Sequence, residues 1–141
     1  MASAPTSQDN VYAIASTLHN SKLTPKSNSK LTLLLVNEFE NQLTDWRNIF
    51  GTHFQIQTAS DGLMALKAIL NGNIDIVLSS TQLAQMTSAD VCKFVKQHKS
   101  TEHIQMIFIS DHYSEIEEEQ MLDLGAIDYI ASDTLPKILF S

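Results

Sequence analysis

Two serines end the most apolar short segment of the chain and are the first candidates for chemistry. Residues 74–80 read Ile-Asp-Ile-Val-Leu-Ser-Ser, and a polar loop, residues 81–86, follows them. An almost continuous apolar run of this length is typical of a strand that is buried on both faces of a parallel sheet. Ligands of such sheets bind beyond the carboxyl ends of the strands, so Ser79 and Ser80 stand where chemistry would be done. A hydroxyl without an adjacent base is, however, a weak nucleophile at neutral pH.

The other predicted strand ends also carry polar side chains. These are Asn37 and Glu38, Ser110 and Asp111, and Ser132 and Asp133. His112 is the one histidine close to them, and none of the five histidines of the chain has metal-ligand spacing. Magnesium prefers several carboxylates in near-octahedral geometry, and Glu38, Asp111 and Asp133 are weak candidates for that role. We therefore expect no metal site and no cofactor.

Short apolar runs alternate with segments of helical periodicity from residue 31 onward. The predicted strands are residues 31–36, 54–58, 74–79, 104–109 and 128–131. The predicted helices are residues 39–50, with Phe39, Leu43, Trp46 and Phe50 on the apolar face, 63–70, with Leu63, Leu66, Ile69 and Leu70, then 88–98, 113–124 and 134–141. This alternation predicts an α/β domain with a five-stranded parallel sheet, strand order 2-1-3-4-5, and helices on both faces, which is the flavodoxin-like arrangement.

Composition limits the class of protein and its partners. A chain of 141 residues is long enough for one domain with a substantial core. Its net charge of −7 argues against sequence-independent binding to nucleic acid or to an anionic membrane surface. The single cysteine, Cys92, excludes an intramolecular disulfide, and its apolar neighbours favour a buried side chain. The sequence shows no signal peptide and no apolar run long enough to span a membrane, so we expect a cytoplasmic protein.

The first 30 residues differ in composition from the rest. Ser, Thr, Asn, Lys and Pro dominate residues 1–30, and residues 21–30 are typical of a linker. Within this leader, residues 10–19 could form a short helix with Val11, Ile14, Ala15 and Leu18 on one face. A disordered tail explains the same composition, and both interpretations remain open. Residues 31–141 form the predicted domain.

Several segments together resemble the receiver domains of response regulators, the CheY-like variant of this fold. The similar segments are Leu33-Leu34-Leu35-Val36-Asn37-Glu38, the run that ends at Ser80, Ile107-Phe108-Ile109-Ser110, and Leu124-Gly125-Ala126-Ile127-Asp128-Tyr129-Ile130. The resemblance covers about residues 31–139, with the segments in the order and at the spacing of that family. It implies a module of two-component signalling, in which a phosphorelay charges an aspartate.

The resemblance implies a phosphorylation site whose chemistry is largely lost here. The family's acidic pair falls on Asn37 and Glu38, its phosphate-accepting aspartate on Ser80, its Thr or Ser on Ser110, its lysine on Ser132, and its mobile aromatic on Tyr129. An acyl phosphate requires a carboxylate, and a phosphoryl group in transit is stabilised by a cation. Ser80 and Ser132 supply neither. We therefore expect a non-enzymatic pseudo-receiver that regulates by binding protein, independently of phosphorylation.

Alternatives remain open for the domain and for its surface. The domain could be a working receiver that uses Glu38, Asp111 or Asp133, or a flavodoxin-like sensor of a small molecule. Ser80 could be a hydroxyl that only satisfies its loop, or the target of a serine kinase. The acidic run Glu115, Glu117, Glu118 and Glu119 is either a solvated face or a docking surface beside Tyr129 and Ser110, on the face that the family often uses for partners.

The last predicted helix is too short to resemble that of the family. Residues 134–141 carry four large apolar side chains, Leu135, Ile138, Leu139 and Phe140. Burying them would contribute roughly 6–12 kcal/mol, which is comparable with the stability of a whole domain. We expect this region to be covered by further chain beyond residue 141, by a second copy in a homodimer, or by the leader helix. The expected partners are thus a protein or an attached output domain, not nucleic acid or membrane.

Overall fold

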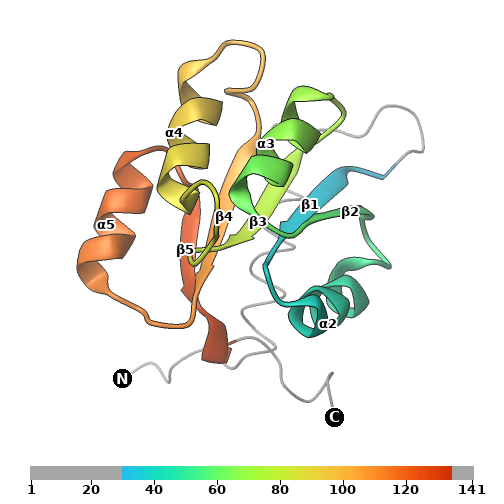
Figure 1. Cartoon of the computed structure of the whole chain (residues 1–141), viewed down its shortest axis with the longest axis horizontal. Helices are drawn as coiled ribbons and strands as arrows, with labels where there is room; N and C mark the ends of the chain where they lie inside the picture. The colour runs from blue at the N-terminus through green and yellow to red at the C-terminus, as the bar shows by residue number, and fades with distance from the viewer. Residues whose placement is uncertain (1–29, 135–141) are drawn as a thin grey trace, which may run out of the picture.

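A computed structural model describes residues 30–134 of the chain. The strands are β1 (Thr32–Val36), β2 (Gln55–Ala59), β3 (Ile76–Ser80), β4 (Gln105–Ser110) and β5 (Asp128–Ala131). The helices are α2 (Glu40–Phe50), α3 (Gly62–Leu70), α4 (Ser88–Gln97) and α5 (Glu115–Asp123), and a 3-10 turn, η1 (Ser132–Thr134), follows β5. All strands are parallel in the order β2-β1-β3-β4-β5 (Figure 1). The predicted flavodoxin-like fold is confirmed.

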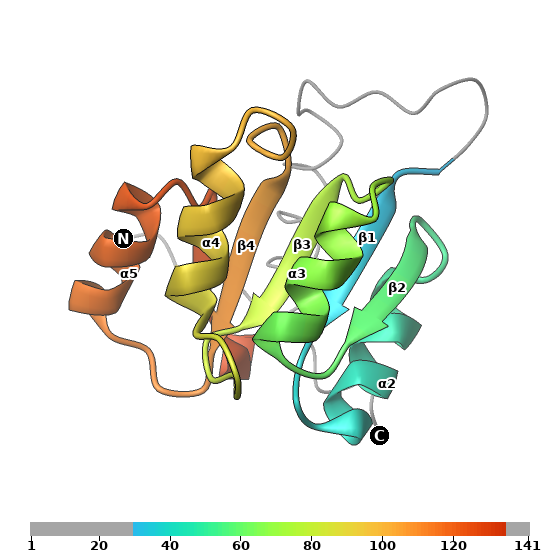
Figure 2. The ribbon, with the colours of Figure 1, turned by 45° about the horizontal axis from the view of Figure 1, so that its top comes forward.

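The helices divide unequally between the two faces of the sheet. Alternate side chains of β1 point in opposite directions, so Leu34 and Val36 belong to one apolar cluster and Leu33 and Leu35 to the other. The first cluster includes residues of α3, α4 and α5, and the second includes residues of α2. Figure 2 shows α3 and α4 in front of the sheet and α2 behind it.

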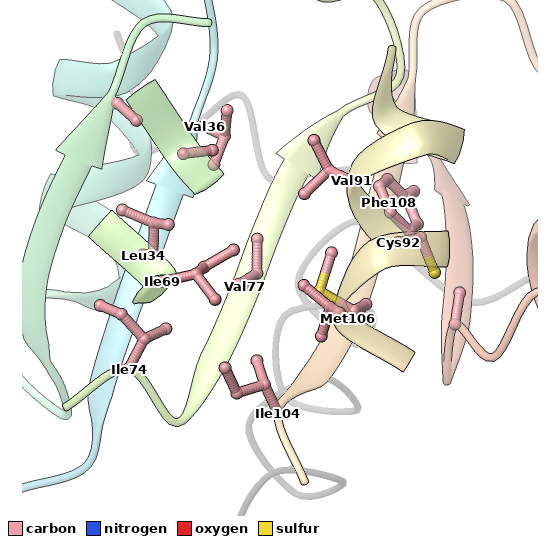
Figure 3. Close-up of a cluster of buried hydrophobic side chains, with 14 of the residues drawn as sticks. Leu34, Val36, Ile69, Ile74, Val77, Val91, Cys92, Ile104, Met106 and Phe108 are labelled. Atoms are coloured by element: carbon pink, nitrogen blue, oxygen red, sulfur yellow. The ribbon is translucent and has the colours of Figure 1, made fainter. Parts of the chain in front are cut away.

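The larger cluster holds the sheet to α3 and α4. Figure 3 shows Val77 of β3 and Phe108 of β4 in this layer, with Ile69 of α3 and Cys92 of α4. Every residue of β1 and β3 is buried, as expected for central strands covered on both faces. Cys92 has no exposed surface, which confirms the prediction of a buried thiol.

The first two helices meet the core differently from the predictions. Phe39 is exposed, because the backbone is extended there and the helix begins one residue later. In α3, Ile69 is buried as predicted, but Leu63 and Leu70 are exposed, and Gly62 and Ala65 are buried in their place. The predicted apolar residues and the buried residues both recur at helical spacing. The small side chains of Gly62 and Ala65 let α3 approach the sheet more closely. The predicted core faces of these two helices were therefore wrong in part.

The bounds of β5 are as predicted, and several other boundaries differ by one or two residues. Helix α5 begins at Glu115 instead of residue 113, because the Ser114 hydroxyl accepts a hydrogen bond from Glu117 N and caps the helix. Helix α4 ends at Gln97, and β3 begins at Ile76, two residues later than predicted. The expected leader helix at 10–19, the apolar residues of 135–141 and the homodimer contact inferred from them lie outside the described residues. Between residues 30 and 134, no helix is long and apolar enough to span a membrane.

Candidate functional site

The strand register brings four of the predicted site positions to one edge of the sheet. Val36 pairs with Ser79, Ser80 with Ile109, and Ser110 with Ala131. Asn37, Ser80, Ser110 and Ser132 therefore end neighbouring strands in the order β1, β3, β4 and β5. This edge is the place where an open parallel sheet binds its ligands.

The side chain of Asn37 is fully buried and uses both ends of its amide. Its Oδ1 accepts a hydrogen bond from Phe39 N at 2.9 Å, and its Nδ2 donates to Gln42 Oε1 at 2.7 Å. The backbone N–H of Asn37 donates to Ala59 O at 3.1 Å. These contacts hold the turn between β1 and α2. The amide of Asn37 therefore has a structural role at a position where the family carries an acid.

The two serines that end β3 make local hydrogen bonds within the strand and the loop that follows it. Ser79 Oγ donates to Ser80 O at 2.9 Å, and Ser80 Oγ accepts from Gln82 N at 3.2 Å. Both serines are buried. No hydrogen bond joins either hydroxyl to a histidine or a carboxylate among the described residues, so neither has the adjacent base that a nucleophilic hydroxyl needs.

The hydroxyl at the end of β4 is also bound to its loop. Ser110 is buried, and its Oγ accepts from His112 N at 3.1 Å. Ser132 follows β5, is partly buried, and stands at the position that corresponds to the family's lysine. This edge therefore presents neutral groups at three positions where the resemblance implies an acid, a nucleophilic carboxylate and a cation.

The remaining carboxylates do not form a metal site. Glu38, Asp111 and Asp133 are all exposed. Within residues 30–134, no group of three or more His, Cys, Asp or Glu side chains is arranged to hold a metal ion. A magnesium ion of the kind the family uses does not fit this donor set, because Glu38 is the one carboxylate at the family's acidic positions, where Asn37 and Ser80 are neutral.

The tyrosine of β5 is coupled to the first turn of α5. Tyr129 is buried and donates a hydrogen bond from its hydroxyl to Glu117 Oε1 at 2.7 Å. Tyr113 donates in the same way to Glu118 Oε1 at 2.9 Å, and the two tyrosine rings lie 5.5 Å apart. Burial raises the pKa of Tyr129, and a hydrogen bond with the Ser110 side chain lowers it. The hydrogen bond to Glu117 raises this pKa further. Both phenols are therefore hydrogen-bond donors at neutral pH.

A shallow hollow of about 380 Å³ opens on the outer side of α5. Its lining residues are Tyr113, Glu115, Glu118, Glu119, Leu122 and Asp123, and we call it the α5 hollow. The sequence predicted the acidic run but not the contributions of Tyr113 and Leu122. The position of Tyr113 directly before a capping serine was the available signal, since such a residue lies over the first turn of its helix.

Known proteins resemble the chain in sequence and in fold. A probable cyclic di-GMP phosphodiesterase of Vibrio cholerae serotype O1 is 28% identical over 102 residues, which cover 72% of this chain and 23% of that protein. The response regulator ArlR of Staphylococcus haemolyticus is 28% identical over 102 residues, 71% of this chain and 45% of that protein. The chain thus spans less than half the length of these curated relatives.

Solved structures share the fold at low sequence identity. The chemotaxis response regulator CheY4 of Vibrio cholerae matches with a TM-score of 0.69 and 17% identity, over 79% of this chain and 94% of that one. A chain of the CheX-CheY-BeF3-Mg+2 complex from Borrelia burgdorferi matches with a TM-score of 0.69 and 22% identity, over 75% and 81%. The model of the response regulator receiver domain matches residues 33–139. The chain belongs to the response regulator receiver domain family, whose members act in two-component signal transduction.

Proposed function

We propose that this receiver domain regulates by binding protein and is not charged by phosphoryl transfer. The observation that carries the proposal is the buried amide of Asn37, with its oxygen bound to Phe39 N and its nitrogen to Gln42 Oε1. The family carries an acid at this position, and its charge can hold a metal ion, whereas the amide here is neutral and holds the turn. The receiver fold around it still presents a surface to which a protein can bind.

The chemistry of the neighbouring positions supports the same proposal. Ser80 has no carboxylate to form an acyl phosphate, and its hydroxyl is engaged with Gln82 N. Ser132 offers no positive charge to a transferring phosphoryl group, which normally depends on metal ions and cationic side chains. Nucleophile, metal ligands and cation would all have to be replaced from elsewhere for transfer to occur.

The direct test is incubation with a small phosphodonor and magnesium, followed by intact-mass spectrometry. We expect no mass increase of one phosphoryl group and no magnesium-dependent change in the fluorescence of Trp46, which is buried in α2. A stable adduct, or saturable magnesium binding that Glu38→Gln abolishes, would contradict the proposal and favour a working receiver with a rearranged acid set.

A rebuilt site provides the matched control. The triple variant with Asn37→Asp, Ser80→Asp and Ser132→Lys restores the residue types that the resemblance implies. We expect this variant to bind magnesium and to accept a phosphoryl group where the natural chain does not. Circular dichroism of both proteins checks that the buried Asn37→Asp change leaves the fold intact, since a buried charge without a partner is destabilising.

The binding surface that we propose consists of α5 and β5, with Tyr129, Glu115, Glu118 and Glu119. The α5 hollow favours a protein ligand at this place, because it is open, partly apolar and lined by hydrogen-bonded side chains. The partner would be a separate protein or an output domain attached to the same polypeptide, as the greater length of the curated relatives suggests. A cytoplasmic location remains a prediction from the sequence.

A further inference from the structure

Helix α5 turns large apolar side chains to solvent. Ile116 is 71% exposed and Leu122 is 42% exposed, while Met121 is the one buried residue of the helix. Figure 1 places α5 beside β5 at one edge of the sheet, with α4 as its neighbour on one side. Leu122 lies together with the exposed ring of Tyr113 in the lining of one hollow, and exposed apolar side chains that lie together can mark an interaction site. The outer side of α5 therefore has the character of a contact surface.

The α5 hollow gives this surface a defined shape. Glu118, Glu119 and Leu122 follow Glu115 by three, four and seven residues, so all four share one face of the helix. Leu122 is the apolar side chain among these carboxylates. The Tyr113 hydroxyl donates to Glu118 Oε1 and so holds one wall of the hollow in place. A hollow of about 380 Å³ can accept an apolar side chain of a partner.

Charge decides which class of partner fits. Helix α5 carries Glu115, Glu117, Glu118, Glu119 and Asp123 and no basic residue, and the chain as a whole has a net charge of −7. A second copy of this face, a nucleic acid or an anionic membrane would bring negative charge against these carboxylates and be repelled. A basic protein segment would meet opposite charge at the carboxylates that line the hollow, and such complementarity speeds association and selects the partner.

We propose that the α5 hollow, together with Ile116, binds a basic and partly apolar segment of a partner protein. Lysine or arginine side chains of that segment meet Glu115 and Glu119, and an apolar side chain enters the hollow against Leu122. The inference rests on the proposed function, because it identifies the chemistry of the partner that a protein-binding receiver would recognise at this face.

The test uses synthetic helical peptides as probes and the full chain as the target. The main probe contains leucine at helical spacing among lysines. In one control peptide the leucines are replaced by serine, and in the other the lysines are replaced by glutamate. Fluorescence anisotropy of the labelled peptide measures affinity, and amide chemical shifts in NMR spectra locate the bound peptide. We expect the main probe alone to bind well and to shift the amides of residues 113–123.

Surface variants separate specific binding from general attraction to an acidic protein. Leu122→Ser should weaken binding by at least about tenfold, as for truncation of a central apolar anchor. Glu119→Lys should weaken it by about threefold or more at low salt and by less at high salt. The matched controls are Leu70→Ser on α3 and Glu40→Lys on α2, which are both exposed in the native chain. They should change affinity by less than about twofold, since they lie outside the proposed contact.

Three results would overturn the inference. These are equal effects of Leu122→Ser and Leu70→Ser, equal binding of the serine-substituted peptide, and concentration-dependent dimerisation that Leu122→Ser abolishes. The last result would assign the hollow to a second copy of the chain. The binding measurements contain no phosphodonor, so they are independent of the test of the proposed function. Phosphoryl uptake would contradict that function alone, and failure to bind a basic peptide without phosphoryl uptake would contradict this inference alone.

Discussion

The hydroxyl of Tyr129 donates a hydrogen bond to Glu117 Oε1 at 2.7 Å, and this contact joins β5 to the first turn of α5. The Ser114 hydroxyl accepts from the backbone N–H of the same glutamate, so two hydrogen bonds meet at one residue. The acidic surface of α5 is thereby tied to β5, the strand that ends at Ser132 beside the other candidate site positions. Tyr129 is held by α5 in this structure and is not free to rotate without breaking that bond.

We expect Tyr129→Phe to lower the free energy of unfolding by about 1 kcal/mol, because it removes one hydrogen bond and leaves a carboxylate that water can reach. Glu117→Ala should cost a similar amount, since it removes the acceptor of a buried phenol. The double variant should be less destabilised than the sum of the two, with a coupling energy of about 0.5–1 kcal/mol. Urea denaturation of the four proteins measures the cycle.

Tyr113→Phe is the matched control for this cycle. Tyr113 also donates to a glutamate of α5, at 2.9 Å from Glu118 Oε1, but its side chain is exposed. Water can replace that bond, so the change in stability should stay within about 0.5 kcal/mol. Equal effects of Tyr113→Phe and Tyr129→Phe would show that burial does not strengthen the Tyr129 contact.

A dependence of stability on high pH follows from the raised pKa of Tyr129. Burial and the Glu117 carboxylate keep this phenol protonated in the folded chain at a pH where an unfolded tyrosine, with a pKa of about 10, begins to ionise. The folded state then binds more protons than the unfolded state. The contribution to stability is therefore complete below about pH 10 and is lost as the pH rises through the folded pKa. Denaturation curves at a series of pH values should show this loss, and it should be smaller in Tyr129→Phe.

The strands and their order were predictable because apolar runs and right-handed crossovers leave few arrangements open. That order also predicts that Asn37, Ser80, Ser110 and Ser132 lie at one edge of the sheet, and this prediction needs no side-chain contacts. The bond from Asn37 to Gln42 was not predictable, because it depends on where the chain turns after β1.

The surface of α5 was the least predictable part of the fold. Ile116 faces solvent while Glu117 turns toward Tyr129, which inverts the usual relation between polarity and burial. A periodicity argument depends on that relation and cannot assign the faces of such a helix. The hydrogen bond to a buried phenol compensates for the inward carboxylate, and no spacing in the sequence reveals it.

The thiol of Cys92 should be unreactive in the folded protein. It is fully buried in the cluster of Figure 3, and burial raises its pKa, so little thiolate forms and reagents cannot reach it. We expect modification by a thiol reagent to be at least about a hundredfold slower in buffer than in denaturant, because it must wait for an opening of the core. As Cys92 is the single cysteine, the signal needs no deconvolution. Ser100→Cys adds a thiol on the surface, and this thiol should react rapidly. Rapid reaction of Cys92 in the natural chain would contradict the prediction and show that α4 separates readily from the sheet.

Gly62 should tolerate a methyl group far less well than Gly72. A Cβ at Gly62 would clash with Met86 O, a backbone atom of the loop that follows Ser80, and Gly62 N donates to Ala84 O in that loop. The Gly62→Ala variant must therefore displace α3 or the loop, and we expect a loss of about 3 kcal/mol or more. Gly72 has a φ of +89° with open space around it, so Gly72→Ala should cost about 1–2 kcal/mol from backbone strain alone. Urea denaturation compares the two, and a Gly62→Ala variant as stable as Gly72→Ala would show that the loop after β3 yields easily and is not fixed against α3.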